Sequence, residues 1–342
     1  MSIQILIILF LTTTCILSSY ATRGKFIVDD VDYTTFSTTL KPDLNLGKDD
    51  DKGEFPRKQL ADCNRQIYKS SLVSNASQAA NRRLNHTTGS WHANGPEFAG
   101  LVVHGGFTGG RAKLAIFAPG NVGDKQYSSA LISVESGEGN DYNLIQVGWT
   151  VNPCLYKDNE IHFFLYAQGV NSQTCWDSHC SDFIPTAGDT ALKFGDILAP
   201  SKVGQIDQNH LELSILKDDR SGWWFIIANG TIVGFWQGHY FSSLNTQATT
   251  VRFGGETYTP AGGDSSPPMG SGVFKPGWPS LTSYMEDVRI NPNIGAGFAP
   301  ENPQTIETRC YYVADVGNTK WFQGLGFFFG GKGGKDQDTC VY

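Results

Sequence analysis

The sequence lacks any cluster of Lys and Arg in its C-terminal three quarters, and its 342 residues carry a formal net charge of -7 at pH 7. Nucleic-acid surfaces need grouped basic side chains to neutralise phosphates, so this charge distribution argues against nucleic-acid binding. No apolar stretch after the N-terminal segment is long enough to span a bilayer. Helical periodicity sustained over three turns is also missing, so a helical domain is not expected.

Several catalytic signatures are absent as well. The chain contains neither the G-x-S-x-G turn of serine hydrolases nor the H-E-x-x-H motif of zinc peptidases, and it has no paired D-T-G turns. The glycine-rich "GFFFGGKGG" has Gly333 where a phosphate-binding loop needs Ser or Thr for magnesium. The histidines are scattered singly, so no metal site is predicted. Neither a metal nor another cofactor is expected.

The first residues predict a signal peptide that is removed after Ala21. "MSIQILIILFLTTTCILSSYATRG" has a mostly apolar run followed by Ser19 and Ala21 in an S-x-A arrangement suited to cleavage, although a basic n-region is lacking. A membrane anchor is the alternative, but three threonines interrupt the run and it is short for spanning. We therefore expect a secreted, extracellular protein with residues 1–21 as leader and no membrane association after its removal.

Secretion makes disulfide pairing the default reading of the cysteines beyond the leader. They are Cys63, Cys154, Cys175, Cys180, Cys310 and Cys340. Cys175 and Cys180 are near neighbours in "TCWDSHC", where a zinc site with His179 is the weaker alternative because no second ligand pair is present. The sequons at Asn75, Asn85 and Asn229 fit an N-glycosylated secreted chain.

Composition divides the chain near residue 95. Residues 22–94 are polar, charged and poor in aromatics, which indicates a weakly structured segment. Residues 95–342 contain short β-rich runs separated by glycine: "AGLVVHG", "AKLAIFAPG", "SSALISVESG", "IHFFLYAQG", "LELSILKD", "GWWFIIANG", "TIVGFWQGHYF" and "TTVRFGGETYTP". Such strands indicate one all-β domain, an antiparallel sandwich or barrel-like fold. The Gly/Pro/Ser-rich "TPAGGDSSPPMGSG" predicts a surface loop.

Two of these strands carry a polar residue beside a glycine on one face. In "NLIQVGWTV", alternation places Gln146 and Gly148 opposite the apolar face that includes Trp149. In "TTVRFGGETYTP", Glu256 shares a face with Gly254. Because a glycine inside a strand marks close approach by a ligand or another backbone, both residues could line one cleft. Two solvent-facing residues beside bulges are an equally valid reading of the spacing.

Several motifs resemble, in the same order along the chain, those of the neprosin family. This family consists mostly of plant secreted proteins and includes proline-directed glutamic endopeptidases. The resemblance runs from about Phe98 to Tyr342 and is carried by "IQVGWTVNPCLYKD", "TCWDSHCSDFI", "GWWFIIANGTIVGFW", "VRFGGETYTP", "MGSGVF" and "DTCVY". It implies a jelly-roll-like, glutamic-peptidase-like β-sandwich over residues 95–342, a prosegment of a proenzyme over residues 22–94, and the disulfides Cys175–Cys180 and Cys310–Cys340. The two catalytic glutamates of the family fall at Gln146 and Glu256.

The sequence departs from the family pattern at several places. Its first glutamate is replaced by Gln146, and the prosegment is shortened. The family's "LFxYW" segment reads "FFLYAQ", with Ala167 in place of a tryptophan, which predicts that the substrate groove has lost an aromatic wall. Cys63 and Cys154 are left over from the family's bridges, and we hypothesise that they join the prosegment to the domain.

Glutamine preserves part of the chemistry of a glutamate pair. When two carboxyls are in contact, one keeps its proton and acts as a donor. A glutamine amide has nearly the shape of that protonated carboxyl and carries a permanent N–H. The fungal eqolisin peptidases, which resemble neprosin in architecture, use such a Gln/Glu pair. The resemblance therefore implies an acid endopeptidase, in the apoplast or cell wall if the protein is from a plant, with Glu256 as base and Gln146 as oxyanion donor.

The expected partner of this enzyme is a peptide or protein substrate, and the family resemblance implies cleavage after proline. The alternative is a catalytically silent relative that binds cell-wall polysaccharide or a partner protein. In that case the stacking residues would be Trp149, Trp223, Trp224 and Trp236, although tryptophans in alternating strands usually pack in the core.

Overall fold

The structure is a computed structural model that describes residues 27–28, 31–32, 95–180, 182–186, 192–260, 263, 265–293, 297–335 and 340. The chain divides into two compact units, Met1–Lys52 and Gly53–Tyr342. In the first unit, the strands β1 (Ile27–Val28) and β2 (Val31–Asp32) form an antiparallel pair. Cys63, Asn75 and Asn85 lie outside the described residues, as do the predicted leader cleavage point and most of residues 22–94.

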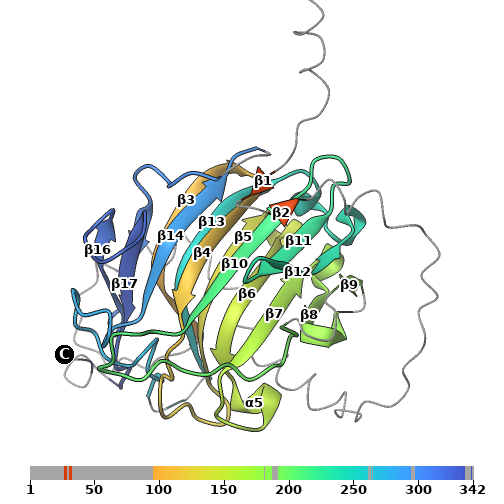
Figure 1. Cartoon of the computed structure of the whole chain (residues 1–342). Helices are drawn as coiled ribbons and strands as arrows, with labels where there is room; N and C mark the ends of the chain where they lie inside the picture. The colour runs from red at the N-terminus through yellow and green to blue at the C-terminus, as the bar shows by residue number, and fades with distance from the viewer. Residues whose placement is uncertain are drawn as a thin grey trace, which may run out of the picture. The chain divides into compact units, whose positions relative to one another are not determined.

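The second unit is an antiparallel β-sandwich, which confirms the predicted fold class (Figure 1). Its seven-stranded sheet has the order β15 (Gln304–Ile306), β3 (Gly95–Phe107), β13 (Ala248–Thr259), β5 (Tyr127–Ser136), β6 (Asn143–Val151), β7 (His162–Gln168) and β8 (Thr174–Trp176). Its eight-stranded sheet has the order β16 (Tyr312–Gly317), β17 (Gly326–Gly330), β14 (Tyr284–Asn291), β4 (Gly109–Ala115), β10 (His210–Lys217), β11 (Trp224–Ala228), β12 (Thr231–Trp236) and β9 (Phe183–Pro185).

Helical structure among the described residues is limited to short turns between strands. The α-helix α5 spans Pro153–Tyr156, and its N-cap Asn152 accepts a hydrogen bond from Leu155 N through its side chain. The 3-10 turns are η2 (Gly139–Asp141), η3 (Val170–Ser172), η4 (Asp177–His179), η5 (Gly238–Tyr240) and η6 (Ser243–Asn245). Among the described residues, none of the helices has the length and apolar character needed to cross a membrane.

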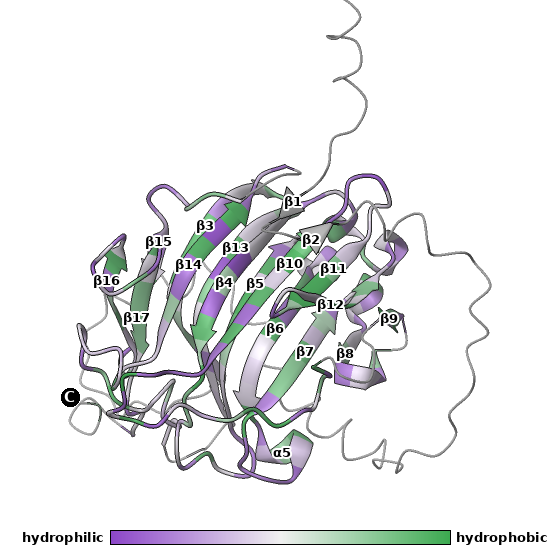
Figure 2. Ribbon diagram, viewed as in Figure 1, coloured by the Kyte–Doolittle hydropathy of each residue, from purple (hydrophilic) through white to green (hydrophobic). Residues whose placement is uncertain are grey.

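The core lies between the two sheets and is filled by the apolar positions of alternating strands. Along β6, Ile145, Val147 and Trp149 are fully buried in this core, as the alternation predicts. Trp149 Nε1 donates a hydrogen bond of 3.0 Å to the Ala115 carbonyl of β4, in the opposite sheet. Figure 2 shows the apolar colouring of β7, whose Phe163 and Leu165 pack in this core, while Phe164 packs in a separate cluster on the other face of the sheet. The two sheets are therefore held together by both packing and a buried hydrogen bond.

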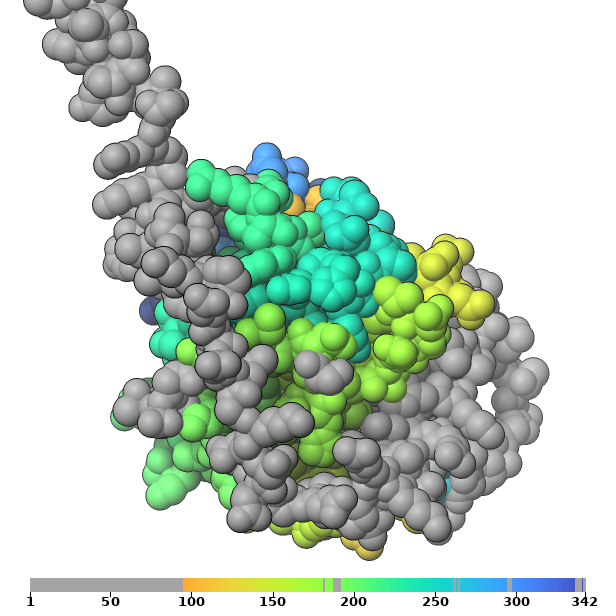
Figure 3. Space-filling view, turned by 90° about the vertical axis from the view of Figure 1, so that its right-hand side faces the viewer, coloured from red at the N-terminus to blue at the C-terminus, as the bar shows by residue number. Residues whose placement is uncertain are grey.

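Asn143 fixes the first residue of β6 against the segment that follows β12. Its side chain is fully buried, and its Oδ1 accepts hydrogen bonds from Ser243 N at 2.8 Å and Ser242 Oγ at 3.1 Å. In Figure 3, residues near η2, in yellow, lie beside the teal segment that contains η5 and η6. This contact sets the position of β6, and hence of Gln146, relative to the other sheet.

The segment "TPAGGDSSPPMGSG" is not a surface loop throughout, contrary to the sequence prediction. Met269 is fully buried and fills the space in front of Gly255 on β13, where a Cβ would meet the Met269 side chain. Ser266 and Met269 form antiparallel bridges with Gly334 and Gly331. Glycine, proline and serine therefore mark an irregular segment here, but one that packs beneath β13.

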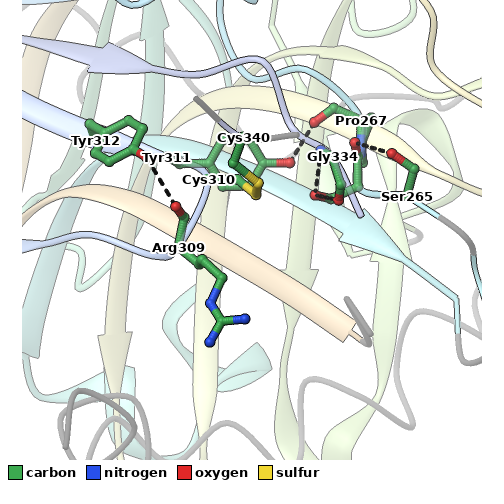
Figure 4. The surroundings of a disulfide bond; sticks show 9 residues. Ser265, Pro267, Arg309, Cys310, Tyr311, Tyr312, Gly334 and Cys340 are labelled. Carbon is green, nitrogen blue, oxygen red and sulfur yellow. Dashed lines mark hydrogen bonds between the residues drawn. A yellow bond between two sulfur atoms is a disulfide. The ribbon is translucent and has the colours of Figure 1, made fainter. Parts of the chain in front are cut away.

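The disulfide Cys310–Cys340 lies beside this segment (Figure 4). Tyr311, next to Cys310, is fully buried and donates a hydrogen bond to the Pro267 carbonyl oxygen. Burial raises the pKa of Tyr311, as does the nearby Glu97, while the hydroxyls of Ser266 and Thr257 lower it. Tyr311 thus lies close to Thr257, the neighbour of Glu256, and supports this end of β13 from the core side.

Candidate active site

Strand register places Gln146 and Glu256 on one face of the seven-stranded sheet. β5 lies between their strands: Glu256 of β13 pairs with Ser129, and Gln146 of β6 pairs with Ser133. Because side chains alternate along a strand, Ser129 and Ser133 share a face of β5, and the two paired residues share it as well. This outer face is opposite the face that packs against the second sheet.

A row of two glycines and one leucine separates Gln146 from Glu256. This row consists of three residues paired across the sheet: Gly254 of β13, Leu131 of β5 and Gly148 of β6. It lies between the row that contains Glu256 and the row that contains Gln146. A Cβ at Gly148 would collide with the Ala130 carbonyl oxygen, and a Cβ at Gly254 with that of Ala99. The glycines are therefore required by the close approach of neighbouring strands, and only the Leu131 side chain stands between the two polar residues.

Glu256 lies among several polar and charged side chains. Tyr127 Oη donates a hydrogen bond of 2.6 Å to Glu256 Oε1, and the Gln146 amide lies close enough to this carboxyl to lower its pKa. Burial raises the pKa of Glu256, and the Tyr127 hydrogen bond and the Arg252 charge lower it. Glu135 raises this pKa again, and the Gln146 hydrogen bond lowers it. The two residues singled out from the sequence thus lie on the same face and near each other, within a network of charges.

The same network contains a buried ion pair that the sequence did not indicate. Arg252 Nε lies 2.7 Å from Glu135 Oε1, and Ser133 Oγ donates a hydrogen bond of 2.7 Å to the same oxygen. The Arg252 guanidinium also lies over the Phe98 ring, 5.6 Å from its centroid. Alternation along β13 places Arg252 on the face of Glu256, but its partner Glu135 becomes recognisable only once β5 is paired with β13.

The outer face beside Gln146 is apolar and aromatic rather than solvated. Gln146 is only 8% exposed, and it pairs with Tyr166, which in turn pairs with Trp176 of β8. These aromatics belong to a second buried cluster with Leu131, Leu144, Leu155 and Phe164. Neither β6 nor the Glu256 end of β13 contains a bulge. The alternative of bulges beside both residues is therefore wrong, and Gln146 is buried, whereas Glu256 is partly exposed.

Two further expectations about aromatic residues are corrected by the structure. Ala167 pairs with Ile145 and is buried in the core between the sheets, so its small side chain removes no wall from the face of Gln146. Trp149, Trp224 and Trp236 are fully buried in the core, and Trp223 stacks on Phe235 with ring centroids 4.6 Å apart. Three of the four tryptophans named for stacking on sugars are therefore inaccessible, and only Trp223 is partly exposed.

The remaining predicted positions are the cysteines and the glycosylation candidate Asn229. Cys175 is bonded to Cys180, which leaves no thiolate there for zinc. Cys154 is disulfide-bonded, and its hypothesised partner Cys63 is outside the described residues. Asn229 is exposed at the turn between β11 and β12, with φ 48°. Within the described part of the chain, no group of three or more His, Cys, Asp or Glu side chains could hold a metal ion.

The chain belongs to the neprosin family: the neprosin family model matches residues 124–332, a range that includes Gln146 and Glu256. Among solved structures, it is similar to scytalido-glutamic peptidase with a transition-state analogue inhibitor, at 11% identity and a TM-score of 0.39, covering 69% of this chain and 97% of that chain. A complex of the same peptidase with a peptide-based analogue has 13% identity, a TM-score of 0.36 and coverage of 69% and 97%. The chicken liver agglutinin CG-16 has 10% identity, a TM-score of 0.22 and coverage of 48% and 96%.

A second buried carboxyl, Asp177, lies at the edge of this sheet, directly after β8. Its Oδ1 accepts a hydrogen bond of 2.8 Å from Leu165 N of β7, and its Oδ2 accepts one of 2.6 Å from Tyr156 Oη of α5. Burial raises the pKa of Asp177 from 3.8 to about 7, against the lowering effects of these hydrogen bonds and of the nearby His162. The side chain thereby continues the pairing of β7 where β8 ends.

The raised pKa of Asp177 predicts a fold that gains stability on acidification. Between about pH 7 and the unfolded value of 3.8, the folded state binds a proton that the unfolded state does not, so this group adds roughly 1.4 kcal/mol per pH unit to the free energy of unfolding as pH falls. Asp177→Asn should therefore be more stable than the parent at neutral pH and similar to it near pH 4. Thermal and urea unfolding at both pH values measure this difference.

Asp141→Asn, a change at an exposed carboxylate, is the matched control for this experiment and should leave the pH dependence unchanged. Equal pH slopes for the parent and Asp177→Asn would show that Asp177 does not change its protonation with folding.

Proposed function

We propose that this neprosin-family chain is a secreted endopeptidase that works in acidic surroundings with Glu256 and Gln146 as its catalytic pair. The observation that carries the proposal is that strand register places both side chains on one face of the seven-stranded sheet, where the Gln146 amide lowers the pKa of the Glu256 carboxyl. Glu256 is the group at this contact that can take and return a proton, and Gln146 is a permanent N–H donor. Together they supply the base and the electrophilic donor that peptide hydrolysis needs.

In the proposed reaction, ionised Glu256 removes a proton from a water molecule as the water oxygen attacks the scissile carbonyl carbon. The Gln146 N–H donates to the carbonyl oxygen and stabilises the negative charge that develops there. The protonated Glu256 then gives its proton to the leaving nitrogen, the C–N bond breaks, and the carboxylate is regenerated. Tyr127 holds one carboxylate oxygen through its 2.6 Å hydrogen bond, which favours the other oxygen for contact with water.

The acidic working range is supported by the electrostatics of two carboxyls. Burial raises the pKa of Glu256, but the donor Tyr127 and the positive charge of Arg252 oppose this rise and so extend the ionised form of Glu256 toward lower pH. The raised pKa of Asp177 favours the folded state below neutral pH. Cleavage after proline is the specificity to be tested first, because the family resemblance implies it.

Gln146→Leu tests the oxyanion donor. Because the loss of one preorganised donor typically costs about 10²- to 10³-fold in rate, kcat should fall by that factor while the protein remains folded. Cleavage of a proline-containing peptide by the purified, processed protein at acidic pH measures the effect. Glu256→Gln should abolish cleavage altogether. If Gln146→Leu cleaves as fast as the parent, Gln146 has no catalytic role, and full activity in Glu256→Gln would remove Glu256 as the base.

Gln146→Glu tests the difference between an amide and a carboxyl as donor. At low pH one of the two carboxyls keeps a proton and can donate, so the variant should remain active. As pH rises and both carboxyls ionise, the donor disappears, and the variant should lose activity at a lower pH than the parent. Profiles of kcat against pH for both proteins measure this alkaline limb. Superimposable profiles would contradict the assignment of Gln146 as the donor.

Tyr127→Phe tests whether the Tyr127 hydroxyl positions and tunes Glu256. Removing a donor from the ionised form raises its pKa, so the acidic limb of kcat/KM should move to higher pH, by about one unit for a charge-assisted hydrogen bond. Tyr258→Phe is a matched control, since its ring stacks on Tyr127 with centroids 5.6 Å apart. A purely structural role would instead lower activity equally at every pH.

A further inference from the structure

Two exposed tryptophans lie together on loops of the eight-stranded sheet. Trp278 is 54% exposed in the segment before β14, and Trp321 is 39% exposed between β16 and β17, strands that lie at the left of Figure 1. Gly277 brings them together: a Cβ at this position would lie 3.7 Å from Trp321 Cζ2 and 3.8 Å from Trp321 Nε1. We call Trp278, Trp321, Lys275 and Lys320 the Trp–Lys surface.

Each of these indole rings is accompanied by an exposed lysine. Lys275 Nζ lies 4.8 Å from the Trp278 ring centroid, and Lys320 Nζ lies 4.4 Å from that of Trp321. Each ring therefore keeps an ammonium group beside it through a cation–π contact. Asp287, which lies against Gly324 in the same loop, is paired with Arg111 and Arg289, so its charge is balanced by other groups.

The loops that carry the tryptophans are held by their own hydrogen bonds. Trp278 O accepts from Leu281 N at 2.9 Å and from Thr282 N at 3.0 Å, and Lys275 N donates to Thr282 Oγ1 at 2.7 Å. Trp321 N lies 3.2 Å from its acceptor Thr319 Oγ1. A surface ordered in this way loses little conformational entropy when it binds. The two rings are exposed side by side, and contiguous exposed apolar groups of this kind often mark a binding site.

We propose that the Trp–Lys surface binds an acidic polysaccharide built of uronic acid residues. The electron-rich face of an indole attracts the polarised C–H groups on the face of a pyranose ring, and a carboxylate on that sugar would meet the ammonium group beside the indole. A neutral sugar would give the two lysines no charged partner. The site is formed by other residues than Gln146 and Glu256, so it does not depend on the proposed peptidase activity.

Other occupants fit this surface less well. A stable protein partner typically covers about 800 Å² on each side, whereas two rings and two lysines form a small area. Binding to an anionic membrane usually depends on clusters of about four to eight basic residues. The net charge of the chain is -7, so general attraction to polyanions is weak and binding would have to be local.

Native affinity electrophoresis of the full chain tests the proposal. Gels contain polygalacturonate, hydroxyethyl cellulose as a neutral glucan, or polyglutamate as an anion without sugar rings. We expect polygalacturonate alone to retard the parent protein. Trp278→Ala and Trp321→Ala should each weaken retardation by roughly 2- to 10-fold, the range for one aromatic contact. Lys275→Gln and Lys320→Gln should weaken retardation by polygalacturonate and leave thermal unfolding unchanged.

Ile197→Ala is the matched control, because Ile197 is 60% exposed and pairs with His162 of β7, in the other sheet. It should migrate as the parent does in every gel. Absence of retardation, or retardation that survives the tryptophan substitutions, would overturn the proposal. Equal retardation by polyglutamate would reduce the effect to charge alone, and equal retardation by the neutral glucan would exclude recognition of the uronate carboxyl. Peptide cleavage by the same variants should equal that of the parent.

Discussion

The contact between Gln146 and Glu256 depends on how closely the strands β3, β13, β5 and β6 approach one another. Gly148 and Gly254 stand in the row between the two residues, and neither position has room for a Cβ, because the backbone of the neighbouring strand occupies that space. The lack of side chains at these two glycines lets the strands pair closely. It also leaves Leu131 as the main side chain in the row between Gln146 and Glu256. Two long polar side chains can therefore meet above it.

A glutamine rather than a second carboxyl at position 146 determines how charge is balanced beside Glu256. Two carboxyls in contact would share a proton, and their pKa values would belong to the pair. Here the pKa of Glu256 is set by burial, by the donors Tyr127 and Gln146, and by the charges of Arg252 and Glu135. Because Arg252 is itself paired with Glu135 at 2.7 Å, it moderates Glu256 without forming a full ion pair with it.

Period-two alternation predicted both faces of β6 and β13 from the sequence, because a side chain's face in a regular strand depends only on its position. The same rule would have placed Ala167 in the core beside Phe163 and Leu165, and the family comparison misled there. β14 was not recognised: Asp287 has φ 50°, and a register shift between Glu286 and Arg289 breaks the alternation.

The contacts of Tyr127 with Glu256, and of Glu135 with Arg252, could not be predicted, because they depend on the register of strands that are distant in the sequence. Burial of the outer face was missed for a similar reason. The aromatic residues that make it apolar, Phe164, Tyr166 and Trp176, lie on β7 and β8, so β6 alone carries no sign of them.

The carboxyls of Asp177 and Glu256 tie the fold and the proposed chemistry to pH in opposite directions. Asp177 is neutral below a pKa of about 7, so its contribution to the free energy of unfolding grows as the solution becomes acidic. Glu256 must be ionised to act as a base, so its contribution to catalysis disappears when pH falls below its own raised pKa. Tyr127 and Arg252 lower the pKa of Glu256, so this loss occurs at a lower pH than it would without them. Acidification therefore strengthens the contribution of Asp177 to folding and weakens the proposed role of Glu256 as a base, and the Tyr127 hydrogen bond and the Arg252 charge oppose the second effect.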